Sequence, residues 1–208
     1  MPSFILLASA SPRRHEILDQ LGIPHGILRI PAPEGEDEPQ LPGEAAADYV
    51  RRTARDKAER AVAWLASGGR PEPLPAVWPA TWRDAPILCA DTTVILDGDV
   101  LGKPRDAADA AEMLRRLSGR DHEVHTAVVL AHQGAFHEAV SISTVRFQPL
   151  TQADIAAYVA SGEPFGKAGG YAIQGRAAAL VAHQAGSHSG VMGLPAHETS
   201  RLLALCRG

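Results

Sequence analysis

The stretch ILCADTTVILDGDVL, residues 87–101, decides the fold class. Its first four residues form an apolar run that is typical of a buried strand, and two short runs, Val94–Leu96 and Asp99–Leu101, flank Asp97-Gly98. An Asp-Gly pair between apolar runs is a strong signal for a tight hairpin turn. Because hairpins pair strands antiparallel while strands and helices alternate elsewhere, we expect an α/β fold with a mixed sheet rather than a purely parallel one.

Strands and helices are predicted on both sides of this stretch. Upstream, a buried strand at 4–8 leads into a helix from Pro12 to Leu21, which Ser11 caps and Gly22 ends. A long helix is predicted over 44–65, with these positions toward the core: Tyr49, Val50, Ala54, Ala58, Val62 and Leu65. Downstream we expect a helix over 106–117 that Asp106 caps, and strands over 123–131 and 136–147 joined by a Gln133-Gly134 turn. Thr151, with Asp154 three residues on, opens another helix, and a strand over 178–182 and a helix over 195–206 follow.

Residues 67–86 differ from the rest of the chain, with five prolines, two glycines and two tryptophans. Flexible linkers rarely carry tryptophan, so we expect an insertion on one domain spanning 1–208, with Trp78 and Trp82 packing on the surface beside it. The composition also allows this insertion to bind a partner.

The composition is that of a globular protein of 208 residues, enough for one α/β domain or two small lobes with a shared core. A net charge of -4 gives no global field for nucleic acid or an anionic membrane, so a polyanionic ligand would need a local cluster of cations or a metal. The N-terminus has no signal-peptide pattern, and no apolar run is long enough to span a membrane. We therefore expect a soluble, cytoplasmic protein whose cysteines, Cys89 and Cys206, form no metal motif.

Arg13 and Arg14 fall in the first turn of the predicted N-terminal helix, where the helix dipole favours anions over cations. The free N–H groups of that turn suit a phosphate. Two arginines make sense there if a polyanion lies between them, held by bidentate hydrogen bonds. The residues alone equally allow a solvated helix end whose arginines pair with the acidic loop at 31–43.

Two further polar residues suit phosphate chemistry. Asp91 is expected at the C-terminal end of the strand over 87–90, a usual place for active sites in α/β sheets, where a carboxylate can hold Mg²⁺ or orient a water. A turn-capping role for Asp91 has equal weight. Lys103 lies between Gly102 and Pro104, outside any P-loop pattern, and could reach a phosphate as a point charge.

The glycine-rich stretch at 166–175 permits a ligand to approach the backbone closely, and Tyr171 and Gln174 could offer a base a ring face and an amide. The alternative is a structural loop whose glycines take positive φ. Histidine chemistry is not predicted, because His122 and His125 would point to opposite faces of a strand and the later histidines are scattered. The acidic run at 34–38 is either a solvated loop or a source of oxygens for a metal.

Taken together, these segments resemble the Maf family of nucleotide pyrophosphatases. The resemblance rests on the following segments, in chain order: LASASPRR at 7–14, ADT at 90–92, GKP at 102–104, LSG at 117–119, KAGGYAIQG at 167–175 and VMGLP at 191–195. It implies a two-lobed α/β fold with an elongated mixed sheet and a deep central cleft. It also implies hydrolysis of a nucleoside triphosphate to the monophosphate and pyrophosphate, dependent on Mg²⁺ or Mn²⁺.

The resemblance also implies roles for individual residues. Asp91 matches the family's catalytic acid, and the metal would be held by Asp91 with a loop glutamate, for which we take Glu34. The hydroxyl and cations expected to contact the triphosphate are Ser9, Arg13, Arg14, Lys57 and Lys103, with Lys57 and Lys103 catalytic. Lys167 is expected to bind the substrate. Arg13, Thr92 and Gln174 resemble the branch that acts on dTTP and UTP. Gly190 and the insertion depart from the family pattern.

Two other functions remain open from the sequence. The chain could be a non-catalytic nucleotide-binding regulator of cell division, since the family is also associated with septum formation. An aspartyl-phosphate phosphatase would need Asp-x-Asp, but Asp91 is followed by Thr92-Thr93. No nucleic-acid or membrane partner is expected, and a homodimer is left open.

Overall fold

The computed structural model describes residues 2–31, 39–70 and 78–206. Its elements, in chain order, are β1 (Ile5–Leu7), α1 (Pro12–Gln20), β2 (His25–Ile27), α2 (Ala46–Ala66), η1 (Trp82–Asp84), β3 (Ile87–Leu96), β4 (Asp99–Leu101), α3 (Ala107–Leu117), β5 (Asp121–His132), β6 (Ala135–Phe147), α4 (Gln152–Ala160), η2 (Ala168–Gly170), η3 (Arg176–Leu180), β7 (Val181–Ala185), α5 (His188–Met192) and α6 (Ala196–Ala204).

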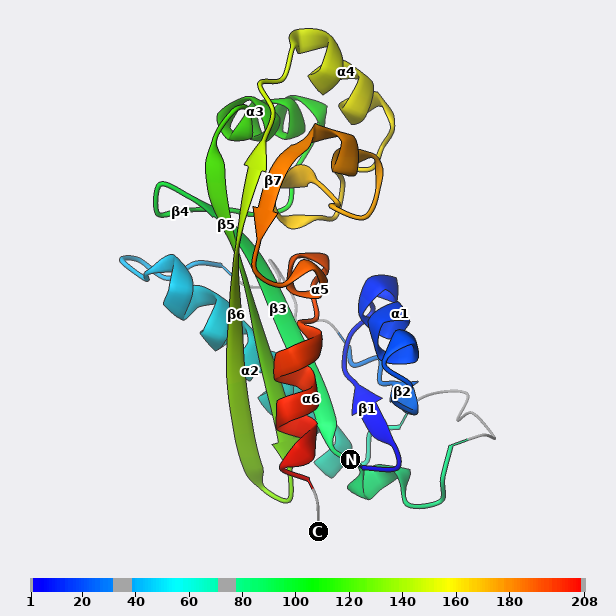
Figure 1. Ribbon diagram of the computed structural model, residues 1–208. Coiled ribbons are helices and arrows are strands. Elements are labelled where there is room, and N and C mark those ends of the chain that lie inside the picture. Colours follow the sequence, from blue (N-terminus) through cyan, green and yellow to red (C-terminus); the bar gives the residue numbers. More distant parts are fainter. Residues whose placement is uncertain (1, 32–38, 71–77, 207–208) are drawn as a thin grey trace.

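The strands form one mixed seven-stranded sheet in the order β2-β1-β3-β5-β6-β7, and β4 pairs with β3. β1 is parallel to both β2 and β3, whereas every other pairing is antiparallel. Figure 1 shows β5 and β6 running along most of the molecule's length, with α2 and α6 beside them and α3 and α4 gathered at one end. The predicted α/β fold with a mixed sheet is confirmed.

Alternation along the strands divides the core at one end of the sheet into two layers. Ile87 and Cys89 of β3 pack in a cluster with α2, while Leu88 and Ala90 point to the opposite face and pack in a cluster with α1 and α6. β1 and β5 alternate in the same way between these clusters. A third cluster, at the other end of the sheet, includes Val94 of β3 together with residues of α3 and α4.

The structure confirms the predicted hairpin turn at Asp97-Gly98 and the caps at Asp106 and Thr151. Asp97 and Gly98 both take positive φ, 55° and 87°, as a two-residue hairpin turn that matches strand twist requires. Asp106 accepts a hydrogen bond from the backbone of the first turn of α3, and Thr151 forms a capping box with Asp154 at the start of α4.

The structure corrects four details of the predicted elements. β3 does not end before Asp91 but continues to Leu96, because the polar residues in its middle remain paired with β5. The strand expected over 178–182 begins as the 3₁₀ helix η3 and becomes β7 only at Val181. On α2, Val62 is 36% exposed, whereas Thr53 and Ala61 are buried.

The fourth correction concerns the tryptophans of the insertion at 67–86, of which residues 71–77 lie outside the described part. Trp82 is 6% exposed and belongs to the core cluster under α2 rather than to the surface. Trp78 packs edge-on against it, with ring centroids 5.5 Å apart. Apolar ring burial therefore fixes the end of the insertion that precedes β3.

Candidate active site in a cationic cleft

The floor of the candidate site is an open stretch of the edge of β3. β1 pairs with β3 only as far as Leu88, and β4 pairs with the same strand only from Val94. In the described ranges no strand occupies this side of residues 89–93. The gap lies just beyond the C-terminal end of β1, which is parallel to β3. Active sites of α/β proteins usually lie at the carboxyl ends of parallel strands, so the gap has this position although Asp91 itself is in mid-strand.

Asp91 is held from α2 by two contacts. Lys57 Nζ donates to Asp91 Oδ1 at 2.6 Å, and Thr53 Oγ1 donates to Asp91 Oδ2 at 2.8 Å. Thr53 and Lys57 are four residues apart, so they share one face of α2. The Asp91 side chain is 14% exposed and Lys57 is 24% exposed, which places this ion pair at the bottom of an open cleft.

Thr53 was missed by the sequence interpretation. A threonine inside a charged helix carries no signal of its own, and its spacing from Lys57 becomes informative only when Asp91 is known to face α2. Each carboxylate oxygen of Asp91 has accepted one hydrogen bond and retains further lone pairs. This donor set fits Mg²⁺ or Mn²⁺, which take one or two carboxylates and complete their shell with substrate phosphates and water.

The two arginines of the first turn of α1 are held by backbone carbonyls at the C-terminal end of α5. Arg13 Nε donates to the Met192 carbonyl at 3.2 Å, and Arg14 Nε donates to the Gly193 carbonyl at 2.8 Å. Arg14 also donates to Ser9 Oγ at 3.1 Å. The predicted alternative, pairing with the acidic loop, involves residues 32–38 and lies outside the described residues. A backbone carbonyl accepts a hydrogen bond without carrying a formal charge, so these two contacts orient the guanidinium groups without forming ion pairs.

The start of α1 is suited to an anion in its own right. Ser11 is the N-cap residue, but its side chain makes no capping hydrogen bond, and the first turn contains no acidic residue. Burial lowers the pKa of Arg13, although Glu16 and Tyr158 act in the opposite direction. A desolvated cation beside free helical N–H groups favours binding of a negatively charged group.

A cavity of about 410 Å³ joins these elements. Of the predicted site residues, those lining it are Arg13, Arg14, Lys57, Asp91, Thr92, Lys103 and Lys167. Five of these seven are cations and one is an acid, in a chain whose net charge is -4. Burial, and the charge of Arg13, lower the pKa of Lys167. The described residues of the cleft therefore supply the local cationic cluster that a polyanionic ligand requires.

The remaining predicted residues lie elsewhere. Ser9 does not line the cavity as described, and its hydroxyl accepts a hydrogen bond from Arg14. Gln174 is exposed and is not among the described residues that line the cavity. Glu34 lies outside the described residues. The structure thus brings together seven of the predicted residues and places Ser9 in support of one of them.

The glycine-rich loop is fixed by Glu163, which the sequence interpretation also missed. Its carboxylate accepts from Tyr158 Oη at 2.8 Å and from the backbone of Arg176 at 3.1 Å and of Ala177 at 3.4 Å. Burial raises the pKa of Glu163, but these hydrogen bonds outweigh it and the pKa lies below its usual value. A Cβ at Gly175 would lie 2.5 Å from this carboxylate, so a larger residue there would displace Glu163 from these hydrogen bonds.

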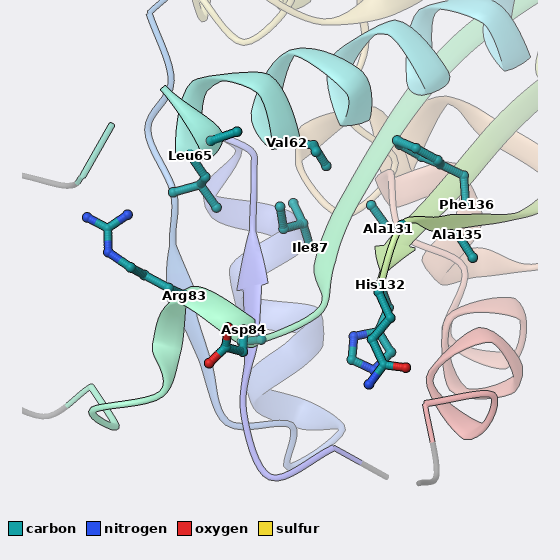
Figure 2. Close-up of a pocket in the computed structure, with 13 residues that line it drawn as sticks. Val62, Leu65, Arg83, Asp84, Ile87, Ala131, His132, Ala135 and Phe136 are labelled. Carbon is teal, nitrogen blue, oxygen red and sulfur yellow. The ribbon is translucent and has the colours of Figure 1, made fainter. Parts of the chain in front are cut away.

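A second cavity, of about 570 Å³, lies near the start of β3, where Ile87 is part of its lining. Figure 2 shows Val62 and Leu65 on the last turns of α2 and Phe136 at the start of β6, all lining this cavity. Its lining is mainly apolar and includes none of the predicted site residues. Although this cavity is the larger, the chemistry of charge places the candidate site in the smaller, cationic one.

Comparisons with known proteins identify the family of the chain. The family model described as Maf-like protein matches residues 4–206. The chain belongs to the Maf family. It is 62% identical over 202 residues to a dTTP/UTP pyrophosphatase of Bordetella pertussis, covering 97% of this chain and 92% of that protein. Proteins with the same name from Bordetella avium and Burkholderia thailandensis are 58% and 52% identical, each over 96% of this chain and over 93% and 91% of their own lengths.

The predicted resemblance to the Maf family is thereby confirmed, and it includes the stretch VMGLP, whose Met192 and Gly193 carbonyls hold the arginines. The packing of the described residues accounts for the long strands and for the position of the cleft. Among the described residues, no helix combines the length and the apolar character needed to cross a bilayer.

Proposed function

We propose that this chain hydrolyses dTTP and UTP to the nucleoside monophosphate and pyrophosphate. The observation that carries the proposal is the Asp91–Lys57 pair, which lies on the open edge of β3 inside a cleft lined by four further cations. A carboxylate surrounded by fixed positive charge suits hydrolysis of a phosphoric anhydride, because it can accept a proton while the cations stabilise the leaving group. The names of the Maf relatives support the same activity and the same substrates.

The triphosphate would lie along the gap in the sheet. The first turn of α1 would bind phosphate oxygens through its N–H groups and through Arg13 and Arg14. Lys103 and Lys167, which line the same cavity, would bind the same chain of phosphates as point charges. In this proposal the α-phosphorus would lie near Asp91.

The reaction is attack of water on the α-phosphorus. The new bond joins the water oxygen to that phosphorus, the anhydride bond to the β-phosphate breaks, and pyrophosphate leaves with the electron pair. Asp91 would hold the water and take its proton, while the hydrogen bond from Lys57 keeps the carboxylate in place. When bound to Asp91 and Glu34, Mg²⁺ or Mn²⁺ would add charge stabilisation on the phosphate oxygens.

Base selection is proposed to involve Arg13, Thr92 and Gln174. Arginine and glutamine can pair with the carbonyl and imide groups of uracil or thymine. Thr92 accepts from Arg14 at 3.4 Å and contacts Thr126 at 3.0 Å, so its hydroxyl is already oriented on the wall that Arg14 forms. We also propose that the reaction takes place in the cytoplasm and that the chain is a single domain with an insertion at 67–86.

A panel of nucleoside triphosphates, each supplied with Mg²⁺ or Mn²⁺ and assayed for pyrophosphate, tests the proposal. We expect pyrophosphate from dTTP and UTP, and a loss of several orders of magnitude in Asp91→Asn with folding intact. Normal turnover by Asp91→Asn would refute the assigned role. Nucleotide binding without any product would favour the regulator of cell division, and orthophosphate as the only inorganic product would favour a phosphatase.

A further inference from the structure

A second group of polar side chains lies on the outer side of α1, away from the cleft. His15 and Asp19 are four residues apart on one face of α1, and His15 Nε2 is 3.5 Å from Asp19 Oδ2. The other nitrogen of the same ring, Nδ1, contacts Nε2 of His25 on β2. Potential ligand atoms of the three residues all lie within 4.8 Å of one another.

The hydrogen bonding of His25 prepares its ring for a metal. His25 Nδ1 is 2.8 Å from the Ile23 carbonyl, an acceptor, so this nitrogen carries the proton. His25 Nε2 is therefore the nitrogen with the free lone pair, and it is the one directed at His15. A ring N–H bonded to a backbone carbonyl is the usual outer contact of a metal-binding histidine, because it fixes the tautomer and the orientation of the ring.

We propose that His15, Asp19 and His25 form a binding site for Zn²⁺ or a similar late first-row metal ion. Two imidazoles and one carboxylate are ligands that such ions prefer, whereas Mg²⁺ prefers oxygen. Three protein ligands leave a fourth position for water, and the side chains of His15 and Asp19 are 43% and 61% exposed, so solvent and the ion can reach the site.

The site is separate from the cleft but belongs to the same helix. None of its three residues is among the described residues that line the cavity, although Arg14, which precedes His15, is. A bound ion would join α1 to β2 and thereby fix the helix whose first turn forms one wall of the cleft. The alternative arrangement has no metal: His15 Nδ1 donates a hydrogen bond to His25 Nε2, and Asp19 lies beside the same ring without binding an ion.

Titration of chelator-treated protein with Co²⁺ distinguishes the two arrangements. The experiment uses the whole chain with saturating Mg²⁺, so that oxygen-ligand sites are occupied. We expect one Co²⁺ per chain with the visible absorption of a four-coordinate ion, displaced by Zn²⁺. At a 100-fold excess of free Zn²⁺ over the Kd, the midpoint of thermal unfolding should rise by roughly 5–10 °C.

The variants assign the ion to its residues. His15→Gln and Asp19→Asn, both at exposed helix positions, should lose the absorption band or weaken Co²⁺ binding at least tenfold. The matched control His183→Gln, at an exposed histidine of β7, and the cleft variant Asp91→Asn should both bind like the parent protein. Absence of stoichiometric Co²⁺ binding would overturn the proposal. It would also be overturned if binding survived in His15→Gln but disappeared in Asp91→Asn, because the ion would then lie in the cleft.

Discussion

Replacement of Thr53 by valine tests how Asp91 is held. Thr53 is fully buried, and its hydroxyl donates to Asp91 Oδ2 at 2.8 Å. A hydrogen bond to a charged group contributes about 1.5–3 kcal/mol, and about 1.4 kcal/mol corresponds to a factor of ten in rate. Because the Asp91 side chain is 14% exposed, water can replace part of the lost bond, so we take the lower end of that range. Thr53→Val should therefore lower kcat about tenfold.

The assay is pyrophosphate release from UTP at saturating substrate and Mg²⁺. KM should change less than kcat, because Thr53 contacts Asp91 rather than the cations of the cleft. The control is Thr199→Val, at a fully buried threonine of α6 whose hydroxyl finds no hydrogen-bond partner among the described residues, and this variant should retain the parent kcat.

A double-mutant cycle completes the test. In an Asp91→Asn background, where the carboxylate is absent, Thr53→Val should have an effect of less than about twofold. The reasoning would be refuted by an unchanged kcat in the single variant. It would equally be refuted by the same tenfold loss in the Asp91→Asn background, because Thr53 would then act independently of Asp91.

Three further properties can be checked on the same protein. Burial lowers the pKa of His122 to about 4 from an ordinary 6.5, so the unfolded chain takes up a proton that the folded chain does not as pH falls through this window, and the free energy of unfolding should be about 2 kcal/mol smaller at pH 5 than at pH 7. Urea unfolding should show that this drop is lost in His122→Gln, and an equal drop in both proteins would contradict it. Burial raises the pKa of Cys89 to about 12, so a thiol reagent at neutral pH should modify Cys206 alone until the chain is unfolded, as mass spectrometry can verify. A Cβ at Gly169 would lie 2.8 Å from Val94, so Gly169→Ala should reduce stability by about 1–3 kcal/mol, and an unchanged urea midpoint would show that the loop can shift.

Local signals in the sequence were sufficient for most elements but not for the position of Asp91. The Asp97-Gly98 turn and the Thr151 capping box carry their own geometry, and both were predicted correctly. The polar residues 91–93 interrupt an apolar run and indicated the end of a strand. In the structure they remain paired with β5 and two of them line the cleft, so the interruption marks the site rather than a boundary.

Candidate site residues could be predicted only where their sequence context is itself unusual. This holds for the arginines at the start of α1 and for the cation between Gly102 and Pro104. Lys57 was identified through the family resemblance alone, because a lysine on a charged helix has the pattern of a surface residue. Glu163 could not be identified from the sequence, because its role depends on residues 176 and 177 lying beside it in the folded chain. The roles of Gln174 and Glu34 stay predictions.

The long strands have a consequence for how the molecule melts and moves. β3 supplies Leu88 to a cluster at one end of the sheet and Val94 to the cluster at the other, and β5 likewise supplies Val128 and Val124. Loss of either cluster would therefore disrupt the hydrogen bonds of β3 and β5, on which the other cluster also depends. Heating should produce one cooperative unfolding transition rather than two. Because β3 and β5 run through both clusters, a hinge motion of two lobes about a flexible linker is not expected. Any closure on a bound molecule has to come from side chains and loops, or from twisting of the sheet itself.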